Sequence, residues 1–167
     1  MSRLELYREL YAHEKDGNEK MLAMLGSVPE ESRRDARFQQ AVSIAGHLIA
    51  CRLNWLNRIQ DETLPEEGWY DETADFAALR PRFAVADSRW TDFLVSLDQA
   101  GLAQEFEFAE GEERFRLPVE VQTVQLFGHA SYHRGQVALL VDQLGGEILD
   151  TDYVDWWWTH RKEPIDA

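Results

Sequence analysis

The 167-residue sequence predicts an all-α fold, an antiparallel four-helix bundle with a short β-hairpin between helices three and four. Four segments repeat apolar residues at three- and four-residue steps, which is the period of a helix with one buried face. Between the third and the fourth segment the apolar residues alternate, which is the period of a β-strand. A hydrophobic content of 44% is enough to form a real core, so we expect one domain spanning residues 1–167.

The first two predicted helices are separated by a proline. Helix one covers Leu4 to Leu25, and Pro29 prevents its simple continuation because proline lacks a backbone N–H. Helix two covers about Phe38 to Ile59. The stretch from Asp61 to Glu72 then holds a proline, a glycine and six acidic residues, which predicts a solvated connection.

The last two predicted helices flank the hairpin. Helix three covers roughly Ala74 to Leu97, with Pro81 either near its first turn or at a kink. Alternating apolar residues and a central glycine place the hairpin between Phe106 and Leu117. Helix four begins at Pro118 and runs to about Leu144, where Gly145-Gly146 ends it.

The charge balance excludes several classes of partner. Asp and Glu outnumber Lys and Arg by 31 to 17, which gives a formal charge of −14, and this field disfavours nucleic acid and favours solubility. The longest apolar run, Val137 to Val141, is five residues, far short of the ~20 needed to span a membrane. The single cysteine, Cys51, excludes an intramolecular disulfide, and Met1 to Glu5 lacks an apolar signal, so we expect a cytoplasmic protein.

Two histidines of helix four share one face. His129 and His133 are four residues apart, so their imidazoles project about one turn from each other. Leu126, Gln136 and Leu140 continue this face, which places it on the interior side of the bundle. Such a pair alone is weak evidence for a metal site.

A third histidine strengthens the hypothesis. His47 lies in the middle of helix two, one turn from Ile44 and one turn from Cys51, so we expect it to point inward as well. Three unpaired buried histidines are hard to sustain because each pays a desolvation cost, which a shared cation removes. The sequence therefore predicts a divalent-metal site built from His47, His129 and His133.

Three neutral imidazoles would leave the double charge on the metal and one open position, as in catalytic zinc sites. Such a site lowers the pKa of a bound water toward ~7 and ionises a coordinated thiol. Zinc or nickel is the expected metal, with iron or manganese as alternatives, because ligand type separates these metals poorly. No pair of carboxylates is distinguished by its spacing, so catalytic residues stay unassigned.

Residues beside the histidines have competing interpretations. Gln136 either orients a ligand or a metal-bound water, or makes an ordinary interhelical hydrogen bond. Arg134 is expected to point away from the metal toward an acidic partner, and Gly135 to let a neighbouring helix approach closely. Cys51 is interpreted as a small buried apolar residue rather than a fourth ligand.

The C-terminal segment contains three consecutive tryptophans, Trp156-Trp157-Trp158, after a short helical turn that Asp150 or Thr151 can cap. We expect the tryptophans to pack on the bundle or across a subunit interface, because they cannot all face solvent cheaply. The alternative is an aromatic wall beside a ligand pocket. His13 and His160 are expected to be structural or solvated.

Two motifs carry a resemblance to a known family. The string Gly128-His129-Ala130-Ser131-Tyr132-His133-Arg134-Gly135-Gln136 in helix four follows His47-Leu48 and Trp55-Leu56 in helix two. Together with the order of the segments over nearly the whole chain, these motifs resemble the DinB/YfiT-like metalloenzymes. Two positions depart from the family pattern, since Gly128 stands where an amide residue is often found and Cys51 stands near where an acidic or polar residue sometimes occurs.

The resemblance implies a four-helix bundle, often homodimeric, with His47, His129 and His133 as the metal ligands. Better-studied members of the family are transferases or isomerases that use low-molecular-weight thiols such as mycothiol, bacillithiol or glutathione. Membership alone does not fix a substrate.

The leading hypothesis is a metal-dependent transferase or hydrolase that activates a low-molecular-weight thiol or a water, with a small-molecule substrate. A second hypothesis is a noncatalytic metal-containing binding or stress-response module, in which the ion ties two helices together. A third is a metal-free helical dimer whose histidines only form hydrogen bonds in the core.

Overall fold

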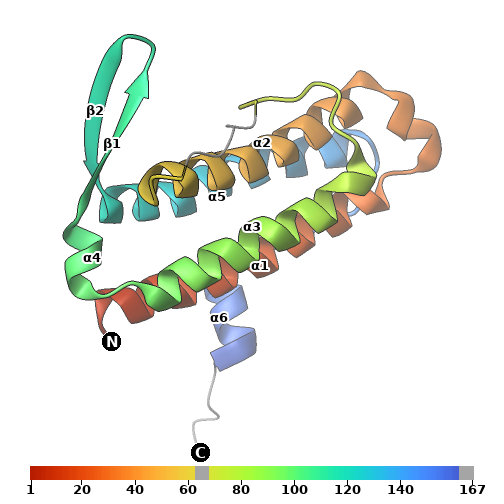
Figure 1. Cartoon of the computed structure of the whole chain (residues 1–167). Coiled ribbons are helices and arrows are strands. Elements are labelled where there is room, and N and C mark those ends of the chain that lie inside the picture. Colours follow the sequence, from red (N-terminus) through yellow and green to blue (C-terminus); the bar gives the residue numbers. More distant parts are fainter. Residues whose placement is uncertain (63–67, 162–167) are drawn as a thin grey trace, which may run out of the picture.

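The computed structural model describes residues 1–62 and 68–161. Four long helices form the bundle (Figure 1), namely α1 (Arg3–Ser27), α2 (Ala36–Ile59), α3 (Phe76–Ser96) and α5 (Val119–Gln143). The shorter elements are η1 (Glu30–Arg34), α4 (Gln99–Ala103), α6 (Tyr153–Arg161) and an antiparallel pair of strands, β1 (Glu105–Glu110) and β2 (Glu113–Pro118). The predicted all-α bundle with one hairpin is confirmed.

Local capping groups explain why the long helices begin and end close to their predicted limits. Ser2 and Glu5 form a reciprocal capping box at the start of α1. Asp35 and Asp75 accept hydrogen bonds from the first backbone N–H groups of α2 and α3. α5 ends before Gly145, whose φ of 79° lies in the left-handed region that glycine tolerates. The sequence prediction missed η1 and α4, which have only five residues each and show no helical period.

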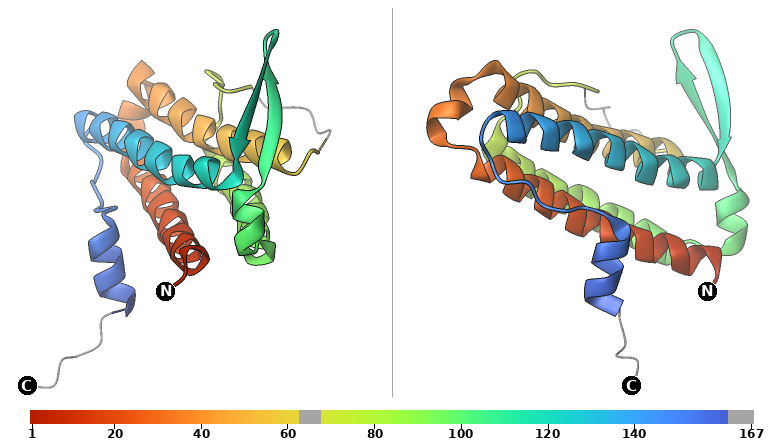
Figure 2. Two further views of the ribbon diagram at one scale, coloured as in Figure 1. Left: turned by 90° about the vertical axis from the view of Figure 1, so that its left-hand side faces the viewer. Right: turned by 180° about the vertical axis from the view of Figure 1, so that it is seen from behind.

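The four long helices lie side by side, with α1 and α5 running in one direction and α2 and α3 in the other (Figures 1 and 2). α5 packs against α2 and α1, while α3 packs against the same two helices from the opposite side. α1 and α2 are therefore diagonal to each other. α3 begins at the end of the bundle where α2 begins, and residues 68–75 lead back toward that end before α3 starts.

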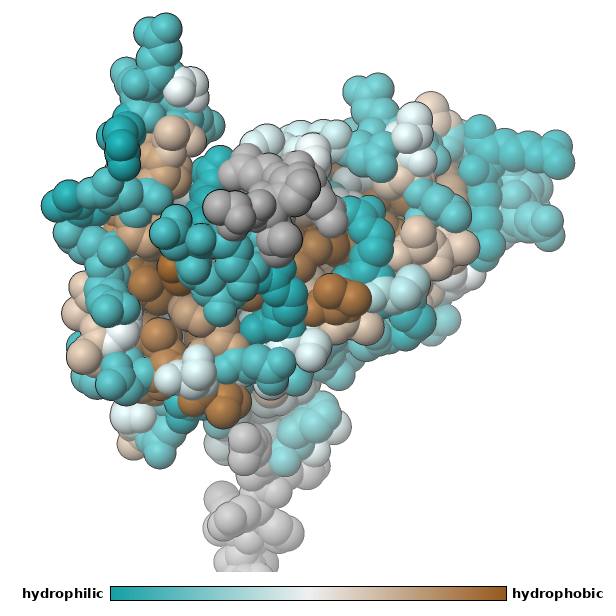
Figure 3. Space-filling view, viewed as in Figure 1, coloured by the Kyte–Doolittle hydropathy of each residue, from teal (hydrophilic) through white to brown (hydrophobic). Residues whose placement is uncertain are grey.

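The hairpin lies at one end of the bundle and projects beyond the helices (Figure 1). Its register pairs Phe106 with Leu117 and Phe108 with Phe115, so the alternating apolar residues of the two strands lie opposite each other. Phe108 packs edge-on against Trp55 of α2, with ring centroids 5.0 Å apart. Figure 3 shows hydrophobic residues gathered below the hairpin, near the C-terminal ends of α2 and α3. The hairpin thus extends the apolar core beyond the helices.

The interior is mainly apolar, and two clusters of buried residues fill it. One surrounds Leu25 and Ile49, and the other surrounds Leu56 and Trp90, which lies nearer the hairpin. Burial of such side chains supplies most of the stability of a bundle. Within the described ranges, the helices include none with both the length and the apolar character that crossing a membrane requires.

One buried ionic cluster interrupts this core. Glu14 of α1 accepts hydrogen bonds from Arg134 of α5 and from Arg52 of α2, and all three side chains are at most 3% exposed. Arg134 thus finds the acidic partner that the sequence predicts. The close approach expected at Gly135 is wrong, because an added Cβ there would meet no atom within 4 Å. Gly17 is the glycine beside this cluster, since an added Cβ there would lie 3.0 Å from the Arg134 guanidinium carbon.

The tryptophan segment packs against the outside of the bundle through α6. Trp156 is buried and its ring lies 5.7 Å from that of His13 in α1, whereas Trp157 and Trp158 remain exposed. His13 Nε2 also lies 2.9 Å from the carbonyl oxygen of Thr151. Trp156 therefore packs on the bundle, as predicted for this segment.

Candidate metal centre

The three predicted histidines lie on two helices that pack against each other. His47 is in the middle of α2, and His129 and His133 are on consecutive turns of α5. Because α2 and α5 are antiparallel neighbours, their facing sides bring the three rings together. His47 and His133 are buried and His129 is half-buried.

The ring nitrogens converge on His129. Its Nε2 lies 3.2 Å from Nε2 of His47 and 3.1 Å from Nε2 of His133. A tetrahedral zinc ion with Zn–N bonds of ~2.0–2.1 Å holds its nitrogen ligands about 3.3 Å apart. The two distances that His129 Nε2 makes therefore match the spacing that a zinc ion would impose on a pair of nitrogen ligands.

Hydrogen bonds on the far side of two rings fix which nitrogen carries the proton. His47 Nδ1 lies 2.5 Å from the carbonyl oxygen of Trp69, and His133 Nδ1 lies 2.7 Å from Oε1 of Gln136. Both oxygens can only accept, so both Nδ1 atoms donate, and the two Nε2 atoms of the neutral rings carry lone pairs. His129 Nε2 faces both lone pairs and can supply a proton to only one of them, so a cation shared by these nitrogens would fit the group.

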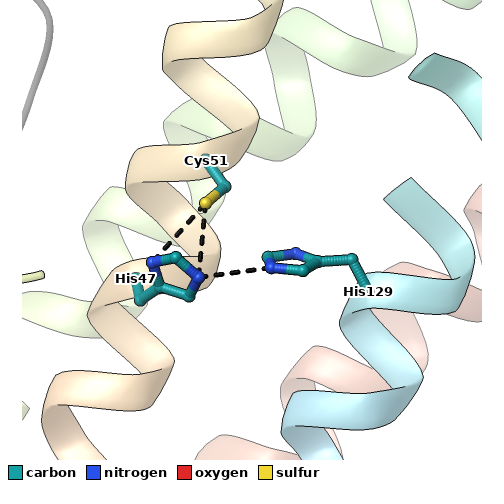
Figure 4. A group of neighbouring side chains, drawn as sticks. All are labelled: His47, Cys51 and His129. Carbon is teal, nitrogen blue, oxygen red and sulfur yellow. Dashed lines mark hydrogen bonds between the residues drawn. The ribbon is translucent and has the colours of Figure 1, made fainter. Parts of the chain in front are cut away.

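Cys51 also belongs to this group of donors. Figure 4 shows its thiol above the His47 ring, with Sγ 3.5 Å from both ring nitrogens. The candidate ligand atoms of His47, Cys51 and His129 all lie within 4.8 Å of one another, so these residues could hold a metal ion. The sequence interpretation of Cys51 as an ordinary apolar residue therefore undervalued it. The signal that pointed to it was its position one helical turn after His47.

Burial keeps the imidazoles of His47 and His129 neutral. Desolvation, together with the nearby charges of His133, His47 and Arg52, lowers the pKa of His129 to about 4. Desolvation also lowers the pKa of His47, although the hydrogen bond to the Trp69 carbonyl opposes this shift. Burial raises the pKa of the Cys51 thiol to about 12. At pH 7 the nitrogens of His47 and His129 are therefore free to bind a cation, while Cys51 would first have to lose its proton.

The segment after α2 supports His47 in a way that the sequence prediction missed. Tyr70 stacks on the His47 ring at a centroid distance of 4.0 Å and an interplanar angle of 2°. Trp69 supplies the carbonyl oxygen that orients the same ring. Both residues fall in the stretch predicted to be a solvated connection, and only their aromatic character could have suggested a packing role.

The other predicted residues divide between the site and the rest of the bundle. Gln136 contacts His133, and its amide nitrogen donates to the Tyr132 hydroxyl at 3.3 Å. His13 and His160 lie elsewhere, where they pair with backbone carbonyls of the C-terminal segment. Gln136 therefore contacts the histidine cluster through His133 Nδ1, the ring nitrogen opposite the one that faces His129.

A small cavity adjoins the donors. It has a volume of about 90 Å³, lies between α2, α3 and α5, and is reached by Cys51 and His129. Its other walls are largely apolar or aromatic and include Trp55, Trp90 and Leu126. The cavity is several times larger than a single water needs, so a few atoms of a small molecule could approach the donors.

Replacing Gln136 by alanine is expected to weaken zinc binding by about 10- to 100-fold, the usual cost of losing a residue that orients a ligand. The physical reason is that His133 Nδ1 loses its acceptor and the ring loses its preferred tautomer and orientation. Competition titration against a chromophoric chelator measures the effect. The control is Gln143→Ala at an exposed position of the same helix, and equal affinities of the two variants would contradict a positioning role for Gln136.

Comparison with known proteins adds one finding. The family model of the DinB family matches residues 1–164. No curated protein and no solved structure matched the chain. Because the match covers almost every residue, including the helices that carry the histidine cluster and the tryptophan-containing α6, the chain belongs to the DinB family.

Proposed function

We propose that this protein is a metal-dependent enzyme in which His47, His129 and His133 hold one divalent ion, with zinc or nickel the expected metal and iron or manganese as alternatives. The observation that carries the proposal is the convergence of three Nε2 atoms at 3.1 and 3.2 Å around His129. The lone pairs of His47 and His133 are oriented by acceptors behind the rings, as in metal sites whose ligands are held in place before the ion binds.

The proposed reaction is activation of a low-molecular-weight thiol or of a water. A divalent ion at this place would lower the pKa of the bound group enough to make thiolate or hydroxide at neutral pH. The chain contributes a site in which the imidazoles of His47 and His129 stay neutral, together with a largely apolar cavity that Cys51 and His129 line. A small-molecule substrate fits this environment. The cytoplasm is the proposed compartment, because the unpaired thiol of Cys51 persists in reducing surroundings.

Metal content tests the proposal directly. Protein purified without a histidine tag is expected to bind one equivalent of zinc, and Cys51→Ala is expected to keep it. Loss of zinc from Cys51→Ala with retention in His133→Ala would replace the three-histidine set by His47, Cys51 and His129. Failure of the wild type to bind any of zinc, nickel, iron or manganese would overturn the proposal.

Thiol activation can be separated from water activation with cobalt. In the cobalt-loaded Cys51→Ala protein no thiol of the chain remains, so a charge-transfer band on adding glutathione would report thiolate from the added molecule. The proposed transferase reaction expects this band with at least one low-molecular-weight thiol. If none of the low-molecular-weight thiols gives this band, thiol activation is ruled out and activation of a water, with hydrolysis as the reaction, remains the proposed function.

The second candidate is a noncatalytic module in which the ion ties α2 to α5. Chelation separates the two functions, because a structural ion contributes folding free energy outright. If the site is catalytic, we expect the helical circular dichroism of the metal-free protein to match that of the metal-loaded protein. Loss of the helical signal on chelation would favour the structural role. The cavity at Cys51 and His129 supports the catalytic one.

We also propose that the protein is a homodimer that associates through the outer face of α5. The exposed residues of this face include Val121, Val124, Tyr132 and Leu139. Between Glu120 and Asp142 the helix has one charged residue, Arg134, and it is buried. For a chain of net charge −14, an uncharged face is where two copies meet with the least repulsion.

Leu139→Glu is therefore expected to convert the dimer to a monomer, because the substitution places a carboxylate in the apolar contact of both copies. Light scattering after gel filtration measures the mass. Val85→Glu, at an exposed position of α3, is the matched control and should leave the mass unchanged. A Leu139→Glu protein with the mass of the wild type would contradict this interface.

A further inference from the structure

Glu14 holds two arginines that come from the two helices of the metal centre. Its Oε2 lies 2.9 Å from Arg52 Nη2 and 2.9 Å from Arg134 Nη1, and its Oε1 lies 2.9 Å from Arg134 Nη2. The pair with Arg134 is thus bidentate, which fixes direction as well as distance. Side-chain exposure is 2% for Glu14 and for Arg134 and 3% for Arg52.

Each arginine directly follows a candidate metal ligand in the sequence. Arg52 follows Cys51 in α2, and Arg134 follows His133 in α5. Consecutive residues of a helix leave it about 100° apart but differ in height by only ~1.5 Å. At the same height along the bundle, α2 and α5 therefore each direct a candidate metal ligand toward the other helix and a guanidinium group toward α1.

The contacts of Glu14 span the bundle in two directions. The pair with Arg134 joins neighbouring helices, whereas the pair with Arg52 joins α1 to α2 across the diagonal. Gly17, one turn after Glu14, leaves room for the Arg134 guanidinium, whose carbon would lie 3.0 Å from an added Cβ. One carboxylate thus ties α2 and α5 to the same point of α1.

Both guanidinium groups depend mainly on Glu14 for an acidic partner. Arg52 Nε, Arg52 Nη1 and Arg134 Nε have no hydrogen-bond partner among the described residues. The nearest other acid to Arg52 is Asp87, whose Oδ1 lies 3.9 Å from Nη1 and accepts a hydrogen bond from Tyr11. Removing the Glu14 carboxylate would leave both guanidinium groups to move toward new partners, and the helix segments that carry the donors would move with them.

We propose that Glu14 is a positioning residue for the metal centre, acting through Arg52 and Arg134 to set the separation of α2 and α5 at the level of the donors. This inference rests on the proposed metal site. It assigns to a residue of α1, which contributes none of the candidate ligands, control over the geometry in which the ion is held.

The test compares Glu14→Gln with Leu25→Ala, a variant of a fully buried α1 residue in the apolar core, which destabilises the bundle without touching the arginines. Zinc affinity is measured by chelator competition, and cobalt absorption reports ligand geometry, at a temperature where circular dichroism shows each protein folded. Glu14→Gln is expected to bind zinc about 10- to 100-fold more weakly and to shift the cobalt spectrum. Leu25→Ala is expected to match the wild type in both measurements.

Arg134→Lys keeps the charge but loses the bidentate contact, so it tests the same idea if Glu14→Gln does not fold. Its zinc affinity is expected to fall severalfold with an altered cobalt spectrum. Zinc affinity within twofold of the wild type and an unchanged spectrum, in whichever of the two variants folds, would overturn the positioning role. If the wild type itself binds no metal, the proposed function fails and the inference falls with it, so the two failures are distinguishable.

Discussion

Replacing Glu14 by glutamine is expected to lower the free energy of unfolding by about 3–5 kcal/mol, the usual cost of removing one partner from a buried ion pair. Glutamine has nearly the same shape, so the loss is electrostatic and does not come from a cavity. Two guanidinium groups would stay buried without the carboxylate that neutralises them. Urea denaturation followed by circular dichroism in metal-free buffer measures the change, which should appear in the midpoint with an unaltered slope.

Glu19→Gln is the matched control on the same helix. Glu19 pairs with Arg80, but both side chains are more than half exposed. Exposed pairs contribute about 0–1 kcal/mol because water and salt screen them, so this variant should unfold close to the wild type. Equal stabilities of the two variants would show that the buried cluster is not held together by its charges.

Replacing His129 by alanine is expected to abolish stoichiometric zinc binding, with a loss of affinity larger than the 10- to 100-fold expected for a residue outside the ligand set. His129 contributes the nitrogen that lies 3.2 Å and 3.1 Å from the Nε2 atoms of His47 and His133, so its removal breaks both of these contacts. Elemental analysis after dialysis against zinc gives the stoichiometry, and chelator competition gives the affinity. The loss should occur without loss of the helical signal.

His160→Ala controls for the general effect of removing an imidazole. His160 lies in α6 at an exposed position, and its Nδ1 contacts the Trp156 carbonyl oxygen of the same helix. This variant should keep one equivalent of zinc. Full zinc binding by His129→Ala would remove the three-histidine site, whatever the His160 variant does.

The elements of the fold were predictable because each depends on residues close together in the chain. Periodic apolar residues identified all four long helices, and the alternation around Phe108 identified the hairpin. The run direction of α3 was not predictable in this way. It depends on residues 68–75 leading back toward the end where α2 begins, and no local period in the sequence encodes such a path.

The candidate site divides along the same line. The spacing of His129 and His133 fixes them on one face of α5, since four residues make about one helical turn. Their approach to His47, the entry of Cys51 into the donor group and the support from Trp69 are contacts between segments far apart in the sequence. Charge, composition and helical period determined the bundle and the residues available for a metal. Tertiary packing alone decided which of them meet, because only the packed helices set the distances between their side chains.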